Sequence, residues 1–320
     1  IMPNYQGVWS LTTQMQNASA WPEQPDLSRA LFFGGGNRTN VIDYVVIITL
    51  GNATDFGDLT EGVDYTSSVA SSTRGVTAGG TNASSTLINT IQYVTIDSTG
   101  NTTDFGDLLN TTYGMGGCSS STRGVFAGGI VPTDTPINVI QYITIASTGN
   151  STDFGDILNA REGLAGCGSS TRGIFSGGRD ASYNYYNVIQ YITIASTGNS
   201  TDFGDLTEYV GYSGACSNST RAVRGGGFKA GGNRSNVIDY VTIASTGNAT
   251  DFGDLLAANA MLAGAANSTR GVFGGGNTGS ATNVIQYVEI ASTGNATDFG
   301  DLTTSRSTLS ACSNGHGGLS

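Results

Sequence analysis

Residues 147–156 read Ser-Thr-Gly-Asn-Ser-Thr-Asp-Phe-Gly-Asp, and this stretch recurs along the chain with small changes. Its last four residues begin at six positions: Asp55, Asp104, Asp153, Asp202, Asp251 and Asp298. Successive copies are therefore 49, 49, 49, 49 and 47 residues apart. A regular spacing of this size indicates a solenoid, a propeller or an array of repeats, and it has to be interpreted before any shorter motif.

One repeat unit, residues 122–168, contains four short runs of apolar residues. Each run has about 4–8 residues, is rich in β-branched and aromatic side chains, and is bounded by Gly, Asn, Asp or Ser, which is typical of strands. The run at 138–145 carries apolar side chains on both faces, as expected for a sheet packed between two neighbours. Four strands in a unit of this length match one propeller blade.

The two ends of the chain complement each other. The first unit opens with the run at residues 29–33 and lacks the small-residue strand that precedes this run in later units. The last unit continues into Leu-Ser-Ala-Cys-Ser-Asn at residues 309–314, which matches the missing strand. Pairing the two would complete a blade and remove exposed sheet edges. We therefore expect residues 27–320 to form one all-β domain, a six-bladed β-propeller closed by its C-terminal strand.

The unit resembles the kelch repeat. That family has a Gly-Gly pair at the end of the second strand, a Tyr in the third strand and an aromatic residue near the start of the fourth. Gly128-Gly129, Tyr142 and Phe154 occur in this order, although kelch repeats usually carry Trp where Phe154 stands. The resemblance covers most of the chain and implies a propeller, but it implies no particular activity because propellers host many functions.

Composition limits the possible functions. Charged residues make up 12% of the chain, about half the usual fraction, which excludes a coiled coil or an ordinary helical bundle. The longest apolar stretch, residues 41–50, is interrupted by Asp43 and is far shorter than the ~20 residues of a membrane span. The net charge is −11 and Lys229 is the only lysine. We therefore expect neither a nucleic-acid partner nor membrane insertion.

Four cysteines share one repeat position, where the other two units carry Val69 and Ala265: Cys118, Cys167, Cys216 and Cys312. Exchange with Val and Ala predicts small apolar packing near the propeller axis. Equivalent positions on different blades are usually too far apart for a disulfide, so we expect buried free thiols. A metal or redox role is the alternative.

The six Asp-Phe-Gly-Asp copies supply 12 of the 24 acidic residues. We interpret them as turns in which Asp side chains cap backbone N–H groups. Each unit also carries one arginine, which we expect to pair with one of these carboxylates: Arg29, Arg74, Arg123, Arg172, Arg221 and Arg270. The alternative is calcium held by Asn150, Asp153 and Asp156. Our expectation is that the protein needs no cofactor and no metal.

Catalytic residues are difficult to assemble from this sequence. His316 is the only histidine and lies in a Gly-rich C-terminal tail, so it offers little basis for a serine or cysteine triad. We therefore expect a protein that is not an enzyme. The enzymatic alternative is a propeller glycan hydrolase that uses acidic residues of the variable segments: Asp64, Asp134, Glu162, Asp180 or Glu208.

The six units differ from one another mainly in two places. One is the segment after the Gly-Gly pair, at residues 36–39, 81–88, 130–137, 179–186, 228–235 and 277–282. The other follows Asp-Phe-Gly-Asp. In an antiparallel blade both should emerge on one face, with the near-constant Ser-Ser-Thr-Arg and Ser-Thr-Gly-Asn stretches on the opposite face.

Seven of the 14 tyrosines fall in these variable segments. Exposed tyrosines suit recognition because they offer rigid contact area and a hydroxyl at small entropic cost. We expect a ligand-binding patch on adjacent loops of the fourth and fifth blades, formed by Tyr183, Tyr185, Tyr186, Tyr209, Tyr212 and Phe228. Packing of some of these rings over the blades is the alternative.

Residues 1–26 lie outside the repeat and contain Trp9 and Trp21. This segment resembles one found in bacteriophage tail-fibre and other virion proteins, and the repeats resemble those of environmental phage structural proteins. The resemblance implies a virion or extracellular protein whose N-terminal segment contacts other virion or fibre proteins. Its propeller would be a recognition head for a host cell-surface glycan or protein receptor, through multivalent shallow contacts. A secreted cellular lectin or protein-interaction scaffold is the alternative.

Overall fold

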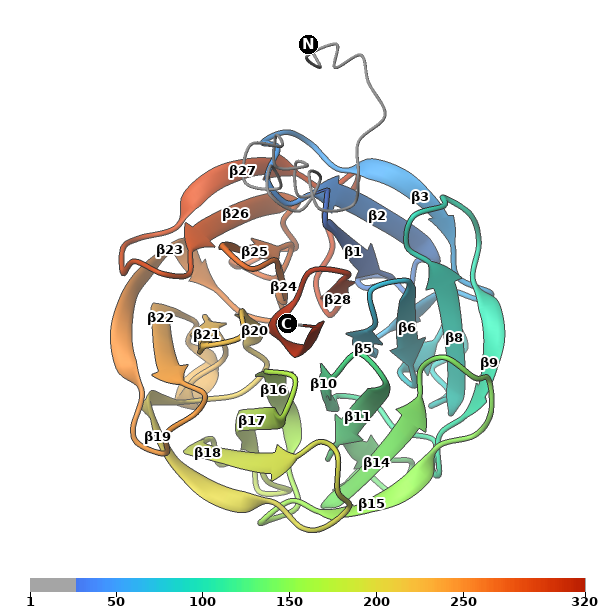
Figure 1. Ribbon diagram of the computed structural model, residues 1–320, viewed down its shortest axis with the longest axis horizontal. Coiled ribbons are helices and arrows are strands. Elements are labelled where there is room, and N and C mark those ends of the chain that lie inside the picture. The colour runs from blue at the N-terminus through green and yellow to red at the C-terminus, as the bar shows by residue number, and fades with distance from the viewer. Residues whose placement is uncertain (1–26, 320) are drawn as a thin grey trace, which may run out of the picture.

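The structure is a computed structural model that describes residues 27–319. Six four-stranded antiparallel sheets surround a central axis, each with its first strand nearest the axis (Figure 1). This arrangement confirms the predicted six-bladed β-propeller. The segment at 1–26, with Trp9 and Trp21, lies outside the described residues.

The four strands of each blade follow one another from the axis to the rim. From the inside outwards, blade 1 comprises β28 (Ser310–Ser313), β1 (Arg29–Phe33), β2 (Val41–Val46) and β3 (Thr54–Asp58). Blade 2 comprises β5 (Ser67–Ala70), β6 (Arg74–Ala78), β8 (Thr90–Thr95) and β9 (Thr103–Asp107). Blade 3 comprises β10 (Gly116–Ser119), β11 (Arg123–Ala127), β14 (Val139–Thr144) and β15 (Thr152–Asp156).

The other three blades repeat this order. Blade 4 comprises β16 (Glu162–Gly168), β17 (Arg172–Arg179), β18 (Tyr186–Thr193) and β19 (Thr201–Val210). Blade 5 comprises β20 (Gly214–Ser217), β21 (Arg221–Gly225), β22 (Ser235–Thr242) and β23 (Thr250–Asn259). Blade 6 comprises β24 (Ala263–Ala266), β25 (Arg270–Gly274), β26 (Val284–Glu289) and β27 (Thr297–Asp301).

Short elements lie between the blade strands and at the C-terminus. β4 (Val63–Asp64) pairs with β7 (Thr81–Asn82), and β12 (Ile130–Val131) pairs with β13 (Thr135–Pro136). Two 3₁₀ turns, η2 (Ala230–Gly232) and η3 (Gly317–Leu319), complete the described elements.

The ring closes as the sequence predicts. β28 pairs antiparallel with β1, with Cys312 opposite Leu31 and Ser310 opposite Phe33. The C-terminal strand is therefore the innermost strand of blade 1. This pairing joins the two ends of the described chain without leaving an open sheet edge at the seam.

The prediction that Asp-Phe-Gly-Asp forms turns is wrong. In blade 3 the motif lies inside β15, the outermost strand, and the same holds in every blade. Phe154 is buried and packs edge-on against Tyr142 of β14 at 5.9 Å. Both residues before Phe154 in β15 are exposed. A strand whose outer side faces solvent can carry these Asp and Gly residues, which is why the composition resembles that of a turn.

The motif also forms the joint between blades. Gly155 has φ +146°, and a Cβ there would lie 2.5 Å from the backbone of Gly198 in blade 4. The neighbouring Asn199 accepts a hydrogen bond from the backbone N–H of Asp156 at 3.0 Å. Equivalent asparagine contacts occur at all six joints. The repeated Ser-Thr-Gly-Asn stretch therefore docks one blade onto the preceding one.

The prediction that the repeat arginines pair with these carboxylates is also wrong. Arg123 lies over the ring of Tyr142, 4.4 Å from its centre, and donates from Nη1 to the carbonyl of Ile194 in the next blade at 2.9 Å. The other five repeat arginines make the same two contacts. The aromatic face and the carbonyl satisfy the guanidinium, so the exposed Asp residues are not needed as partners.

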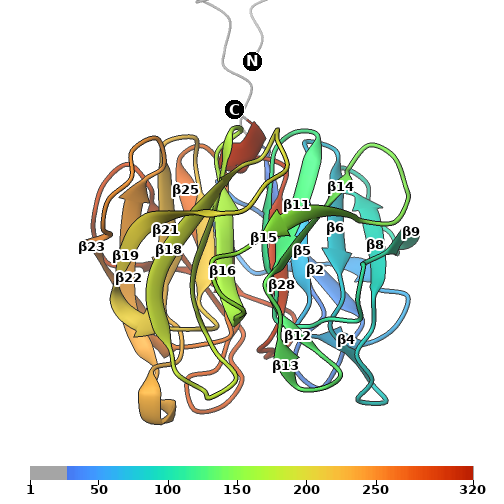
Figure 2. The same ribbon diagram turned by 90° about the horizontal axis from the view of Figure 1, so that it is seen from below.

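The two faces of the disc differ as predicted. Figure 2 shows the C-terminus at one face and β4, β12 and β13 at the other. We call the face that carries β4, β12, β13 and the variable segments the loop face, and the opposite face the turn face.

Candidate functional site

The variable segments converge at the propeller axis on the loop face, where they enclose a cavity of about 490 Å³. This volume lies within the range of about 300–1,000 Å³ that is usual for small-ligand sites. Five aromatic side chains line this axial cavity: Tyr65, Tyr113, Tyr185, Tyr212 and Phe228. Its charged lining residues are Arg38, Asp64 and Arg179. They come from strand ends, loops and connections of blades 1, 2, 4 and 5.

The floor of the cavity is a closed ring of backbone hydrogen bonds. Its members stand ten residues after the first Asp of each Asp-Phe-Gly-Asp copy, and we call them the axial ring: Tyr65, Gly114, Gly163, Tyr212, Met261 and Thr308. Each member donates its N–H to the carbonyl of the preceding member, and Tyr65 donates to Thr308, with N–O distances of 2.7 to 3.1 Å. The ring therefore ties all six blades together at the axis.

Every member of the axial ring has a positive φ, between 56° and 70°. Glycine adopts this conformation freely, whereas a bulky or β-branched residue is rare there and costs of order 1–3 kcal/mol. Tyr65, Tyr212 and Met261 are held in it, and their side chains line the axial cavity. The protein therefore keeps a strained backbone at the place where the variable loops meet.

The aromatic rings at the floor are fixed by one another. Tyr65 packs edge-on against Tyr113 at 5.4 Å and against Tyr212 at 6.0 Å, and Tyr212 packs against Phe228 at 6.4 Å. The hydroxyl of Tyr65 contacts the sulfur of Met261 at 3.9 Å. Burial raises the pKa of Tyr65 and Tyr113 to about 12, so both hydroxyls stay protonated. The result is a rigid, partly accessible aromatic surface with hydroxyl groups at its edge.

A buried carboxylate orients one wall. Glu162 is 1% exposed, accepts the hydroxyl of Tyr212, and pairs with Nε of Arg179 at 2.7 Å. The guanidinium of Arg179 also packs against two tyrosine rings, 4.5 Å from the centre of Tyr183 and 5.2 Å from that of Tyr212. Burial acts to lower the pKa of Arg179, but Tyr212 and Glu162 raise it above its ordinary value, so the group stays charged.

The opposite wall carries a second, looser pair. Arg38 lies 3.7 Å from Asp64 and donates to Ser85 at 2.7 Å. Arg38 and its neighbour Asn37 both have positive φ, so this loop too is strained. Burial raises the pKa of Asp64 although Arg38 opposes it, and the Oδ1 atom of Asp64 is buried without a hydrogen-bond partner among residues 27–319. Asp64 therefore places a largely buried carboxyl group in this wall of the cavity.

The predicted patch divides into two groups. Tyr185, Tyr212 and Phe228 line the axial cavity. The remaining three of the predicted residues, Tyr183, Tyr186 and Tyr209, lie outside its lining. Tyr183 is 59% exposed and packs on Arg179, whereas Tyr186 packs on Arg161 and donates to Asp180 at 2.8 Å. Tyr209 is 61% exposed in β19.

Sequence reasoning missed the half of the cavity that comes from blades 1 and 2. Tyr65 and Tyr113 fall in variable segments, but they are distant in sequence from the tyrosines of blades 4 and 5. Closure of the ring brings them together at the axis. One available signal was the repeat position of Tyr65, where two of the six units carry glycine, which favours positive φ.

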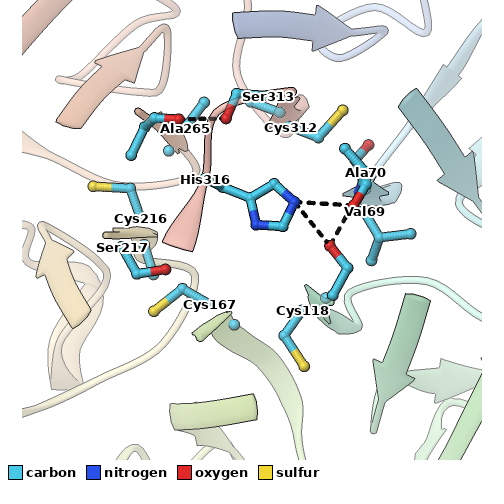
Figure 3. A pocket seen from close by; sticks show the side chains of 18 of the residues that line it. Val69, Ala70, Cys118, Cys167, Cys216, Ser217, Ala265, Cys312, Ser313 and His316 are labelled. Carbon is cyan, nitrogen blue, oxygen red and sulfur yellow. Dashed lines mark hydrogen bonds between the residues drawn. The ribbon is translucent and has the colours of Figure 1, made fainter. Parts of the chain in front are cut away.

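The turn-face end of the axis is closed by the C-terminal residues (Figures 1 and 3). The Nε2 atom of His316 lies 2.9 Å from the carbonyl of Ala70, and its Nδ1 accepts the N–H of Gly318 at 3.0 Å. Ser119 lies 3.3 Å from Nε2. Because Nε2 carries the proton that Ala70 accepts, this histidine is not arranged to take a proton from Ser119.

The cysteines surround this closed channel as predicted, as buried or partly buried free thiols. In Figure 3 the sulfur atoms point away from His316 toward the blades. The sulfur of Cys312 packs against Gly75 of the next blade, where it would lie 3.2 Å from a Cβ atom added to that glycine. Burial raises the pKa of Cys167 and Cys312 to about 12. These thiols are packing groups between blades.

Three of the acidic residues considered for hydrolysis lie together, away from the lining of the axial cavity. Asp64 lines the axial cavity, whereas Asp134, Glu162 and Asp180 border a separate small cavity with Tyr183. Glu208 pairs with Lys229 at 3.0 Å and accepts the hydroxyl of Ser235.

The alternative calcium ligands have other roles or positions. Asn150 accepts the N–H of Asp107 at 3.0 Å, while Asp153 and Asp156 belong to strand β15. Within residues 27–319, no group of three His, Cys, Asp or Glu side chains is placed to hold a metal ion. The same range contains no helix long and apolar enough to cross a bilayer.

Comparison with known proteins found no family model that matches the sequence and no curated protein that matches it. The chain is a six-bladed β-propeller, and its resemblance to kelch repeats and phage tail proteins stays a prediction.

Proposed function

We propose that this propeller is a recognition head that binds a glycan in the axial cavity of its loop face. The single observation that carries the proposal is the convergence of aromatic and hydrogen-bonding side chains from four blades on one cavity. Flat aromatic faces pack against the apolar faces of sugar rings. A few fixed polar groups then set the orientation of the ligand.

The available polar atoms suit a ligand rich in hydroxyl groups. Among residues 27–319, the hydroxyls of Tyr113 and Tyr185 have no hydrogen-bond partner. A sugar hydroxyl both donates and accepts, so it can satisfy groups of either kind. We propose one site on the axis in place of the shallow contacts across adjacent loops that we expected from the sequence.

The proposed setting is a viral tail or fibre tip that binds a host-surface glycan or protein. It rests on the resemblance of the repeats and of residues 1–26 to phage structural proteins. In this setting residues 1–26 contact other virion or fibre proteins, and the protein is extracellular. A secreted cellular lectin or interaction scaffold would use the same cavity. Genes for capsid or baseplate proteins beside this one would favour the viral setting.

A glycan hydrolase is less well supported. Such enzymes generally place two carboxyl groups on either side of the bond that breaks. Of the five acidic residues considered, Asp64 is the one in the lining of the axial cavity, and both oxygens of Glu162 already have partners. Hydrogen bonds from Asn184 and Tyr186 lower the pKa of Asp180 to about 2, which makes Asp180 a poor general acid.

The test is a glycan-binding screen followed by titration of the best ligand. Tyr185→Ala removes an aromatic wall of the cavity and should weaken binding about 30-fold, the effect of losing about 2 kcal/mol. Tyr209→Ala is the matched control, since Tyr209 is exposed on the same blade but lies outside the cavity lining. Equal loss from both variants would contradict the axial site, and failure of every glycan to bind would contradict the function.

A further inference from the structure

We infer that the glycan bound in the axial cavity is acidic, with a carboxylate held by the two terminal nitrogens of Arg179. This inference rests on the proposed function and specifies its ligand. It follows from the way in which the guanidinium of Arg179 is held, from the groups that remain free, and from the charged side chains that line the cavity.

Arg179 is fixed before any ligand arrives. Its Nε is bonded to Glu162, a carboxylate that is itself held by Tyr212. Tyr183 and Tyr212 pack on the guanidinium as well. A guanidinium held by one nitrogen and by two packed aromatic rings loses little conformational freedom when a ligand binds.

The edge of the Arg179 guanidinium that carries Nη1 and Nη2 can bind a carboxylate. Among residues 27–319, neither Nη1 nor Nη2 of Arg179 has a hydrogen-bond partner. Neither atom is among the buried atoms without partners, the side chain is 22% exposed, and the residue lines the axial cavity. Two parallel N–H groups match the two oxygens of a carboxylate in a bidentate pair.

The charged side chains that line the cavity are two arginines and one carboxylate. Both oxygens of Glu162 are engaged behind the wall by Arg179 and Tyr212. Asp64 is the one carboxylate in the lining and is close to Arg38. The hydroxyls of Tyr113 and Tyr185, which have no hydrogen-bond partner among residues 27–319, can donate as well as accept. A ligand that brings an anionic acceptor group therefore complements the cavity better than a neutral or cationic one.

The experiment uses the full chain and matched ligands. An array would carry uronate and sialate oligosaccharides, each beside its carboxyl-reduced counterpart and a sulfated neutral oligosaccharide of the same length. We expect binding to the carboxylated members and at least about tenfold weaker binding to their reduced counterparts, because the bidentate pair is lost. Equal binding to carboxylated and reduced members, or preference for the sulfated ones, would overturn the inference and leave the proposed function standing. Binding to none would overturn both.

A variant pair locates the contact. Arg179→Lys keeps the positive charge beside Glu162 but removes the two parallel N–H groups of the guanidinium, and it should reduce the ratio of the affinity for the carboxylated ligand to that for its reduced counterpart. Lys229→Gln removes a cation elsewhere on the loop face and should leave the preference intact. Retention of the full preference in Arg179→Lys would overturn the assignment. If that variant does not fold, the comparison of ligands on the unmodified protein still decides the inference.

Discussion

The buried ion pair between Asp43 and Arg306 gives a sharp test of the packing between blades. The two side chains are 0% and 1% exposed and 2.6 Å apart, at the seam between blades 6 and 1. Asp43 also accepts hydrogen bonds from the backbone and side chain of Thr303. The equivalent joint between blades 1 and 2 is neutral, because Gln92 accepts the same two bonds from Thr60 at 3.0 and 3.1 Å.

The uncharged joint between blades 1 and 2 shows which residues could replace Asp43 and Arg306. Val63 stands where Arg306 stands, eight residues after the first Asp of Asp-Phe-Gly-Asp, so Asp43→Gln with Arg306→Val copies the joint of blades 1 and 2. Arg306→Val alone leaves a buried carboxylate unpaired and should lower the free energy of unfolding by about 3–5 kcal/mol. Asp43→Gln alone strands the guanidinium and should cost several kcal/mol. The double variant should return to within about 1–2 kcal/mol of the unmodified protein, since similar replacements are often neutral.

Guanidinium unfolding followed by circular dichroism measures this cycle, with stability taken from the midpoint at a constant slope. A double variant whose loss equals the sum of the two single losses would refute the reasoning, because the pair would then act independently. A single Arg306→Val variant as stable as the unmodified protein would refute it as well. Asp239 and Arg224 of blade 5 form a second buried pair, 2.7 Å apart. The substitutions Asp239→Gln and Arg224→Phe, alone and together, give an independent second cycle.

Three further predictions concern the joints between blades, the buried cysteines and His316 at the turn-face end of the axis. Gly155→Ala should destabilise the protein by more than about 2 kcal/mol because its Cβ would meet Gly198, whereas Gly149→Ala, with φ +156° and no atom within 4 Å of its Cβ, should cost less in the same unfolding assay. Cys118 and Cys312 should resist a thiol reagent at pH 8 until the protein unfolds, because both are buried and burial raises both pKa values; rapid modification of the native protein would contradict this. Burial also lowers the pKa of His316 below its ordinary value of about 6.5. The unfolded state therefore binds the proton more readily than the folded state. The free energy of unfolding should fall as the pH drops below about 6.5. The loss should be smaller in His316→Asn; an identical pH profile for both proteins would contradict it.

The repeat determined what the sequence could predict about the fold. The spacing of Asp-Phe-Gly-Asp indicated six blades, and the Cys-Ser stretch at 311–314 indicated the closing strand. The turn assignment of the motif failed because local composition does not distinguish a turn from an outermost strand that faces solvent. The partner of Arg123 could not be predicted, since Ile194 is 71 residues away in the next blade.

The candidate site was predicted only in part for a related reason. Tyr185, Tyr212 and Phe228 were found because their segments are variable and close in sequence. Tyr65 reaches the same cavity only because the ring closes, and its strained backbone is fixed by hydrogen bonds to Thr308 and Gly114 from other blades. The pairing of Glu162 with Arg179 depends likewise on how the strands of blade 4 meet, which residue types alone do not reveal.

A crystal structure of the protein with a bound carboxylated oligosaccharide would test the central claim most directly. We predict ligand density at the loop-face end of the axis, with a sugar ring against Tyr65 or Tyr212 and the carboxylate on the terminal nitrogens of Arg179. Density at the turn face, on the outer strands or on Tyr209 with an empty axial cavity would contradict the account.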